Sequence, residues 1–250
     1  MRLFVLYSNE IGEKIINNLT TKNDTIVAVG FPKSQKINKK INNLLKKLKI
    51  KILYLEKKIS NDFLLKFKSF DVDYMLSIYW PYILKENFFS LPKNGTINFH
   101  LSYLPFNRGK NPNIWPIIDG SPAGVSLHLI NKKVDEGDVI CQSKIKIDII
   151  DNAEKVYKKL VKEIIKLFIT NWDNIKNKRI TIKKQKNKSL LTHTSAHFKD
   201  LSRIKMDKKI YPIELINLLR AKTFSNKKPA YFFHNGKKIF VHIKLRYEKN

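Results

Sequence analysis

Cysteine, arginine and acidic side chains are scarce in this 250-residue chain. The low numbers of cysteine and arginine argue against disulfide-linked, zinc-binding and nucleic-acid-binding proteins. With Cys141 as the single cysteine, neither an internal disulfide nor a thiolate zinc cage can form. No apolar run approaches the roughly 18 residues that a membrane span needs. The apolar residues 1–7 are too short for a signal peptide and predict a buried strand instead. We therefore expect a soluble, cytoplasmic protein without a membrane partner.

Acidic residues number 21 against 49 basic ones, which leaves a net charge of +28. Such a charge normally indicates a nucleic-acid partner or an anionic surface. However, only six basic residues are arginines, and lysine alternates with asparagine and isoleucine over residues 36–51 and 176–188. A dedicated nucleic-acid binder would more often gather arginine on one face. We interpret the charge as a compositional bias on solvated faces, and a non-catalytic nucleic-acid-binding protein stays as the alternative.

Short apolar runs alternate with segments of helical spacing through the first hundred residues. The predicted strands are 2–7, 25–31, 51–55 and 74–79, and the predicted helices are 10–18, 36–48 and 62–69. This alternation predicts a Rossmann-like α/β fold, a mostly parallel sheet with helices on both faces. Residues 8–13 hold one glycine and cannot match the G-x-G-x-x-G fingerprint, which disfavours a nicotinamide or flavin site.

The second half of the chain changes in character twice. Two β-rich stretches, 124–130 and 139–147, precede a helix expected over 152–171. After Arg179 come an expected short strand at 180–184, a polar linker, a helix at 212–219, and a hairpin that turns at Asn235-Gly236. We predict a catalytic domain over residues 1–178. Residues 179–250 then form a small carboxy-terminal α+β module with a β-hairpin, for contacts to a substrate nucleotide or within a dimer.

The candidate catalytic residues are Asn98 and His100, in the segment Asn98-Phe99-His100, and Asp135. Asn98 and His100 alternate on a strand and therefore project to one face, at the end of the sheet where open α/β folds place their ligands. An amide can donate to an oxyanion, a neutral imidazole can accept a proton, and a carboxylate can orient that imidazole. Because the G-x-S-x-G nucleophile motif is missing, we expect direct attack by a bound substrate in an acyl transfer.

These residues stand in a longer pattern, formed by Asn98-Phe99-His100, Leu104-Pro105, Arg108-Gly109, Gly124-Val125-Ser126-Leu127-His128 and Asp135-Glu136-Gly137-Asp138-Val139-Ile140. The pattern resembles the folate-dependent formyltransferases. The resemblance implies N10-formyltetrahydrofolate as the formyl donor and no metal. It implies that Asn98 holds the formyl oxygen, that His100 is a base or charge stabiliser, and that Asp135 orients it. The stretch 78–84 resembles the segment bordering the pterin ring, so the donor-binding residues expected are Trp80, Tyr82, Ile83 and Lys133.

Three branches of that family compete, and the chain most resembles the nucleotide-sugar N-formyltransferases in size, in residues 107–115 and in its short carboxy-terminal module. This branch implies a homodimer that formylates a dTDP-linked amino sugar for O-antigen or lipopolysaccharide synthesis, with dTDP-4-amino-4,6-dideoxyglucose as the expected acceptor. The sequence does not distinguish a C3 from a C4 amine. The substrate-binding residues expected are Lys110, Trp115, Arg220, Phe224 and Tyr231. Methionyl-tRNA formyltransferase is the alternative activity.

Structural interpretations compete with several of these assignments. Arg220, Phe224 and Tyr231 can equally make core or dimer contacts. His128 is expected to be a packed or supporting histidine, although His100, His128 and Asp135 are by type possible metal ligands. Cys141 is expected to be a buried small apolar residue.

Overall fold

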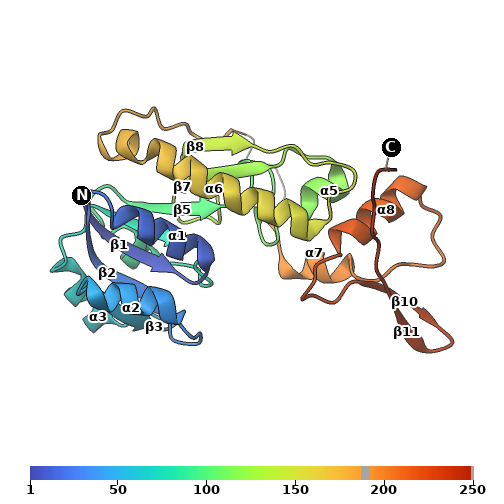
Figure 1. The fold of residues 1–250 in the computed structure, drawn as a ribbon, viewed down its shortest axis with the longest axis horizontal. Helices are drawn as coiled ribbons and strands as arrows, with labels where there is room; N and C mark the ends of the chain where they lie inside the picture. Colours follow the sequence, from blue (N-terminus) through green and yellow to red (C-terminus); the bar gives the residue numbers. More distant parts are fainter. Residues whose placement is uncertain (187–191, 249–250) are drawn as a thin grey trace. The chain divides into compact units, whose positions relative to one another are not determined.

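Seven strands form one sheet, in the order β3-β2-β1-β4-β5-β7-β8, in the computed structural model, which describes residues 1–186 and 192–248 (Figure 1). The strands are β1 (Arg2–Tyr7), β2 (Thr25–Pro32), β3 (Lys51–Leu55), β4 (Tyr74–Ile78), β5 (Thr96–His100), β7 (Gly124–Leu129) and β8 (Val139–Lys144). The pairs among β1 to β5 are parallel, whereas β5 pairs antiparallel with β7. The predicted mostly parallel sheet is confirmed.

The chain divides into two compact units. The first unit is Met1–His100, Ser126–Cys141 and Ile164–Gln185, and the second unit is Leu101–Val125, Gln142–Glu163 and Lys186–Asn250. The strands β7 and β8 and the helix α6 (Ala153–Lys176) contribute residues to both. The boundary expected between residues 178 and 179 stays a prediction.

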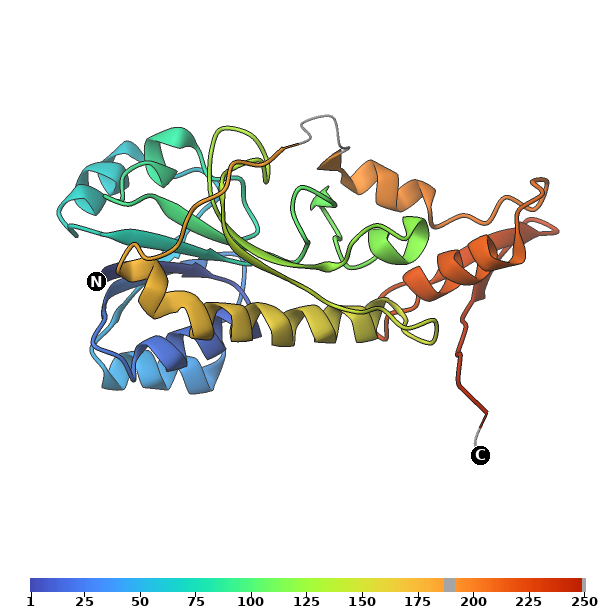
Figure 2. The ribbon, with the colours of Figure 1, turned by 90° about the horizontal axis from the view of Figure 1, so that it is seen from above.

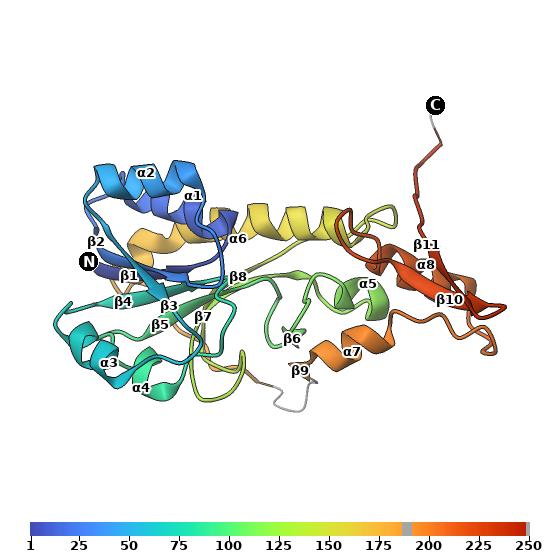
Figure 3. The same cartoon turned by 90° about the horizontal axis from the view of Figure 1, so that it is seen from below.

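Helices cover both faces of the sheet in the first unit, as the sequence predicts. The helices α1 (Glu10–Leu19) and α2 (Lys39–Lys47) lie on one face, with the first-unit part of α6 beside α1 (Figure 2). The helices α3 (Asn61–Lys68) and α4 (Glu86–Phe89) lie on the opposite face (Figure 3). Residues 3–7 of the interior strand β1 are wholly buried, because a strand covered on both faces has no side that meets water.

Aromatic side chains fill the core between the sheet and the helices α3 and α4. The ring of Phe4 on β1 lies 4.9 Å from that of Phe67 on α3 and 6.4 Å from that of Phe88 on α4. On the other face, Phe168 of α6 packs 5.1 Å from Phe99 of β5. Phe99 therefore points toward α6, and its neighbours Asn98 and His100 point to the face that carries Phe4.

The second unit contains short elements. They are β6 (Arg108–Gly109), α5 (Trp115–Asp119), β9 (Thr192–His193), α7 (Ser195–Asp200), α8 (Pro212–Ala221), β10 (Ala230–His234) and β11 (Lys237–Val241). The strands β10 and β11 form the predicted hairpin. Asn235 and Gly236 at its turn have φ angles of 46° and 74°, as a type I′ turn requires.

Two local predictions differ from the structure. Of the strand expected at 180–184, only Lys183 pairs, in a single bridge to Val139. The linker expected after it contains α7, which begins with a reciprocal cap between Thr194 and His197. The usual sequence signal for such a cap has glutamate or glutamine at the position of His197, so the sequence gives little indication of this helix. No helix among the described residues combines the length and hydrophobicity of a membrane span.

The buried aromatic cluster predicts the outcome of a core substitution. Phe67 is 1% exposed, so Phe67→Ala leaves a cavity and should lower the free energy of unfolding by roughly 3–5 kcal/mol. Leu65 lies on the same helix and is 66% exposed, so Leu65→Ala is the matched control, with an expected change within about 0.5 kcal/mol. Urea denaturation measures both changes. Equal losses in the two variants would contradict the assignment of the core.

Candidate active site

The pairing of β5 with β7 brings the candidate catalytic residues together in the first unit. In the antiparallel register Asn98 lies opposite His128, and His100 lies opposite Ser126. Directly opposed residues in a sheet point to the same face, so the Asn98 amide and the His128 imidazole meet side by side. His100 projects from the last residue of β5 onto that face. The prediction that Asn98 and His100 share a face is confirmed.

Asp135 completes a polar cluster around Asn98. The Asn98 Nδ2 atom lies 3.1 Å from His128 Nε2 and 3.4 Å from Asp135 Oδ1. The two carboxylate oxygens of Asp135 lie 3.6 Å from His100 Nδ1 and 3.5 Å from His128 Nε2. One carboxylate thus stands between two imidazoles and an amide. His100 is 8% exposed and His128 1%, so their electrostatic interactions are screened little by water.

His128 fixes the orientation of the Asn98 amide. Its Nδ1 atom lies 2.8 Å from the carbonyl oxygen of Leu129, which can only accept a hydrogen bond. Nδ1 therefore carries the proton in the neutral ring, and Nε2 is left to accept from Asn98 Nδ2. This contact assigns the amide nitrogen of Asn98 to the side facing His128 and Asp135. His128 is the supporting histidine that the sequence leads us to expect.

A tight loop between β7 and β8 presents Asp135. The residue has a φ of 54°, a left-handed conformation that Asp adopts more readily than most residues. Two residues later, a Cβ atom on Gly137 would collide with the carbonyl oxygen of Leu129. Glycine is therefore required for the loop to close against the end of β7. The sequence motif Asp135-Glu136-Gly137-Asp138 has this physical basis.

Gln185 clamps the same loop from a distant part of the chain. Its Nε2 atom donates to the main-chain oxygens of Asp135, at 2.8 Å, and Gly137, at 2.7 Å. The segment that carries Gln185 is aligned by the bridge between Lys183 and Val139. Gln185 is not predicted from the sequence, because a lone glutamine in a lysine-rich segment carries no signal until that pairing is known.

The four residues expected at the formyl donor all lie in the first unit. Trp80 and Tyr82 are partly buried and make an edge contact at 5.6 Å, and the Tyr82 hydroxyl lies 2.9 Å from Ser34 Oγ. Ile83 is 79% exposed. Lys133 follows β7 with an exposed side chain that pairs with Glu136 at 3.8 Å. Their roles stay predictions.

Lys110 and Trp115, two of the residues expected at the acceptor, lie in the second unit. Trp115 is 6% exposed, and its indole nitrogen donates to the main-chain oxygen of Lys110. The Trp115 ring stacks on His193 at 3.8 Å, so His193 covers one of its faces. Lys110 is exposed, and its main-chain nitrogen donates to the oxygen of His193. Their substrate-binding roles stay predictions.

The other three residues expected at the acceptor make contacts within the second unit. Arg220 is 7% exposed and donates from Nη1 to the main-chain oxygens of Asp148 and Asp151. Phe224 lies 5.9 Å from Tyr157. Tyr231 packs against Phe233 and Phe240. These contacts are of the core type expected as the alternative to substrate binding. The substrate-binding roles of Arg220, Phe224 and Tyr231 stay predictions.

Two other predicted features can be placed. Cys141 is partly buried, not fully buried as expected. This partial burial still raises the pKa of its thiol to about 12, which keeps it protonated and unreactive at neutral pH. Among residues 1–186 and 192–248, no group of three or more His, Cys, Asp or Glu side chains has an arrangement that could hold a metal ion. This includes the cluster of His100, His128 and Asp135.

Comparison with protein families assigns the class. A model described as "Formyl transferase" matches residues 1–171, and a model described as "N-formyltransferase dimerization C-terminal domain" matches residues 197–247. The first match covers well over half of the chain. The chain belongs to the formyl transferase family, and the resemblance predicted from the sequence motifs is confirmed.

Curated relatives include two kinds of formyltransferase. A dTDP-4-amino-4,6-dideoxyglucose formyltransferase of Mycobacterium tuberculosis is 30% identical over 61% of this chain and 65% of that protein. A methionyl-tRNA formyltransferase of Malacoplasma penetrans is 28% identical over 92% of this chain and 73% of that protein. The alignments with the first curated relatives cover 18% to 65% of those proteins' own lengths.

Solved structures share the fold over most of the chain. A 4-N formyltransferase from Francisella tularensis is 26% identical with a TM-score of 0.82, covering 99% of this chain and 98% of that one. The formyltransferase PseJ from Anoxybacillus kamchatkensis was solved with UDP-4,6-dideoxy-4-formamido-L-AltNAc and tetrahydrofolate. It is 25% identical with a TM-score of 0.59, covering 80% of this chain and 89% of that one.

The Gln185 clamp predicts the stability of the loop that presents Asp135. Gln185→Ala removes two hydrogen bonds worth about 1 kcal/mol each, so amide hydrogen exchange in residues 131–138 should accelerate by roughly 5- to 30-fold. Gln142→Ala, which removes a hydrogen bond to the Leu104 oxygen, is the control and should leave this loop unchanged. Amide hydrogen exchange in this loop, measured by mass spectrometry, tests the prediction. Wild-type rates in Gln185→Ala would show that the clamp does not hold the loop.

Proposed function

We propose that this protein transfers a formyl group from N10-formyltetrahydrofolate to the amine of a nucleotide-linked amino sugar. The observation that carries the proposal is the cluster of Asn98, His100, His128 and Asp135 inside the region matched by the formyl transferase family. The match of residues 197–247 to the N-formyltransferase dimerization C-terminal domain supports transfer of the formyl group to nitrogen. The likeness to a 4-N formyltransferase along nearly all of both chains supports an amine as the acceptor. The nucleotide sugar in the structure of PseJ supports a nucleotide-linked sugar as the carrier of that amine.

The acceptor we propose is dTDP-4-amino-4,6-dideoxyglucose, the substrate named for the Mycobacterium tuberculosis relative. The formylated sugar would then enter an O-antigen or a related glycan. The tetrahydrofolate bound to the structure of PseJ supports a reduced folate as the donor. A cytoplasmic location stays a prediction from the sequence.

The oxyanion is stabilised by Asn98 in this mechanism. The unprotonated sugar amine attacks the formyl carbon, and the carbonyl oxygen becomes an oxyanion. Asn98 Nδ2 continues to donate one hydrogen bond to His128 Nε2, at 3.1 Å. Its second hydrogen makes only a long 3.4 Å contact with Asp135, which a closer oxyanion can replace.

The proton moves through His100 in the same mechanism. When the tetrahedral intermediate collapses, the bond from the formyl carbon to N10 breaks, and N10 receives a proton as the amine loses one. His100 accepts and returns this proton, and Asp135 at 3.6 Å stabilises the charged imidazolium in between. The products are the formamide sugar and tetrahydrofolate, so atoms and protons balance.

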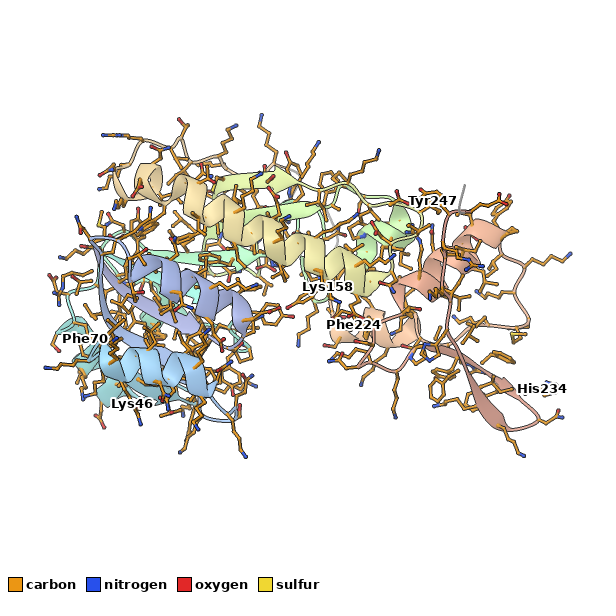
Figure 4. All side chains as sticks on the ribbon, in the orientation of Figure 1. Lys46, Phe70, Lys158, Phe224, His234 and Tyr247 are labelled. Atoms are coloured by element: carbon orange, nitrogen blue, oxygen red, sulfur yellow. The ribbon has the colours of Figure 1, made fainter. Side chains whose placement is uncertain are left out.

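A homodimer through the carboxy-terminal hairpin is part of the proposal. Cross-strand pairs place Tyr231, Phe233 and Phe240 on one face of β10 and β11. Phe233 and Phe240 are each 44% exposed, which is a large apolar area to leave in water. The hairpin lies within the region matched by the dimerization domain, and its tip is marked by His234 in Figure 4.

One assay separates the two candidate acceptors. The protein is incubated with N10-formyltetrahydrofolate and either dTDP-4-amino-4,6-dideoxyglucose or initiator methionyl-tRNA. The formylated product is then followed by mass spectrometry. We expect turnover with the amino sugar. Turnover with the tRNA alone would overturn the sugar assignment.

The proton-transfer role of His100 predicts the effect of its replacement. His100→Asn should lower kcat by roughly 10²–10⁴ while the Kd for a folate analogue stays nearly unchanged. The same substitution at the exposed His242 is the control and should keep wild-type turnover. A His100→Asn variant with wild-type kcat would remove His100 from the mechanism.

The hairpin proposal predicts the state of assembly. Analytical ultracentrifugation at micromolar concentration should show a dimer for the wild type. Phe233→Lys with Phe240→Lys should give a folded monomer, because burying two charges at an apolar interface is costly. Lys237→Glu at the hairpin turn is the control for an altered charge. A wild-type monomer would contradict the proposal.

A further inference from the structure

The positive charge of the first hundred residues is concentrated in one segment. Residues 33–68 contain twelve lysines and two acidic residues. The flanking residues 1–32 contain three basic and three acidic side chains, and residues 69–100 contain two lysines and three acidic side chains. A uniform compositional bias would spread lysine over all three segments. The excess over residues 33–68 is therefore a local feature of the surface.

The helix α2 and the residues beside it hold the densest part of this charge. Residues 36–51 contain seven lysines and no acidic residue, and all seven side chains are exposed. We call these seven residues the lysine face; they are Lys36, Lys39, Lys40, Lys46, Lys47, Lys49 and Lys51. Lys46 is marked on α2 in Figure 4. Within the described part of the chain, none of the seven forms an ion pair.

The periodicity of α2 separates its lysines from its apolar residues. At about 100° per residue, its four lysines fall within an arc of roughly 120° around the helix axis. Ile41 and Leu45 lie on the opposite side of the helix and are 3% and 0% exposed. Because the apolar side is already buried, the lysine face can meet a partner without any rearrangement of the helix.

Two carboxylates interact with segments next to the lysine face, and neither pairs with it. Glu13 on α1 accepts a hydrogen bond from the side chain of Asn38, the N-cap residue of α2, at 3.3 Å. Glu56 follows β3 and pairs with Lys33 at 2.8 Å. The hydrogen bond from Lys33 lowers the pKa of Glu56, which keeps it ionised and bound to that partner. The lysine face is thus left to attract an external polyanion.

The composition of this surface favours a bilayer of anionic lipids over nucleic acid. Residues 33–68 contain no arginine, the side chain that recognises phosphate in two-point contacts. Residues 36–51 contain no aromatic side chain on which a base could stack. Clusters of four to eight basic residues on an amphipathic helix are typical of proteins that bind anionic lipid headgroups.

Leu48 supplies an apolar contact among the lysines. It is the C-cap residue of α2, is 42% exposed and lies between Lys47 and Lys49 in the chain. An apolar side chain in such a position can enter the headgroup region of a bilayer while the lysine amines stay at the lipid phosphates. Because little other apolar area is free on α2, the attraction is mainly electrostatic and should weaken in salt.

We propose that the lysine face binds the surface of a bilayer that contains anionic lipids and holds the protein there reversibly. A peripheral contact of this kind is compatible with the lack of a membrane-spanning helix among the described residues. It departs from the expectation of no membrane partner, because that expectation rests on the lack of long apolar runs. The inference depends on this surface alone and not on the reaction that the protein catalyses.

Sedimentation with lipid vesicles tests the contact. Vesicles of phosphatidylcholine with about 30% phosphatidylglycerol should bind the protein at about 0.1 M salt, and vesicles of phosphatidylcholine alone should leave it in solution. Salt at about 1 M, where the screening length falls to about 3 Å, should release the bound protein. Equal binding to the two kinds of vesicle, or binding to neither, would overturn the inference.

Matched variants assign the binding to the lysine face. The α2 variant, which should bind anionic vesicles roughly 10²–10³-fold more weakly, combines Lys39→Gln, Lys40→Gln, Lys46→Gln and Lys47→Gln. The control variant loses the same charge from exposed lysines of the second unit and should bind as the wild type does; it combines Lys208→Gln, Lys209→Gln, Lys227→Gln and Lys228→Gln. Glutamine forms helices about as well as lysine, so the α2 variant should keep the wild-type Tm. Equal losses of binding in the two variants would overturn the inference.

A second measurement separates lipid from nucleic acid. The binding of a fluorescently labelled tRNA is followed by anisotropy at the same salt concentration, with the wild type and both variants. Binding of tRNA that is lost only in the α2 variant, together with a failure to bind anionic vesicles, would assign the lysine face to nucleic acid and overturn the inference. Formyl transfer is measured separately without vesicles. Its absence would contradict the proposed function and leave the vesicle result unaffected.

Discussion

The antiparallel pairing of β5 with β7 is the constraint on which the cluster of Asn98, His100, His128 and Asp135 depends. This register sets Asn98 opposite His128 and turns both toward the face that also receives His100. A slip of β7 by one residue would set Leu127 or Leu129 opposite Asn98 in place of His128, because successive side chains of a strand point to opposite faces. The site thus depends on the sheet, and the sheet is fixed by the buried apolar faces that flank it.

Asp135 depends on a second constraint, the closed loop between β7 and β8. The loop closes because Gly137 can approach the Leu129 oxygen and because Gln185 ties two of its carbonyl groups together. The carboxylate is then held within 3.6 Å of both imidazoles without contributing to the sheet. The arrangement combines a strand-borne amide and imidazole with a loop-borne carboxylate. This combination suits a reaction in which charge develops on a carbonyl oxygen while a proton moves.

The sequence predicts those elements of the fold that depend on local residue patterns. Apolar runs and helical spacing locate the first four strands and three helices to within a few residues, and the Asn235-Gly236 turn follows from its chemistry. The shared face of Asn98 and His100 follows from strand alternation alone. The motif around Asp135 indicates the family, which the comparison with family models confirms.

Contacts that depend on long-range pairing could not be predicted from the sequence. The contact between Asn98 and His128 joins residues 30 positions apart, and the Gln185 clamp spans 50. Neither follows from spacing, because each requires the register of two strands or the return path of a segment.

The strand register requires that Nε2 of His128 accept a hydrogen bond from Nδ2 of Asn98. Nitrogen-15 NMR of the histidine rings in the folded protein near pH 7.5 tests it most directly, with His128→Gln identifying the signal. We predict a protonated Nδ1 and an unprotonated Nε2, as the 2.8 Å contact to the Leu129 oxygen requires. A protonated Nε2, in either the other tautomer or an imidazolium, would contradict the account.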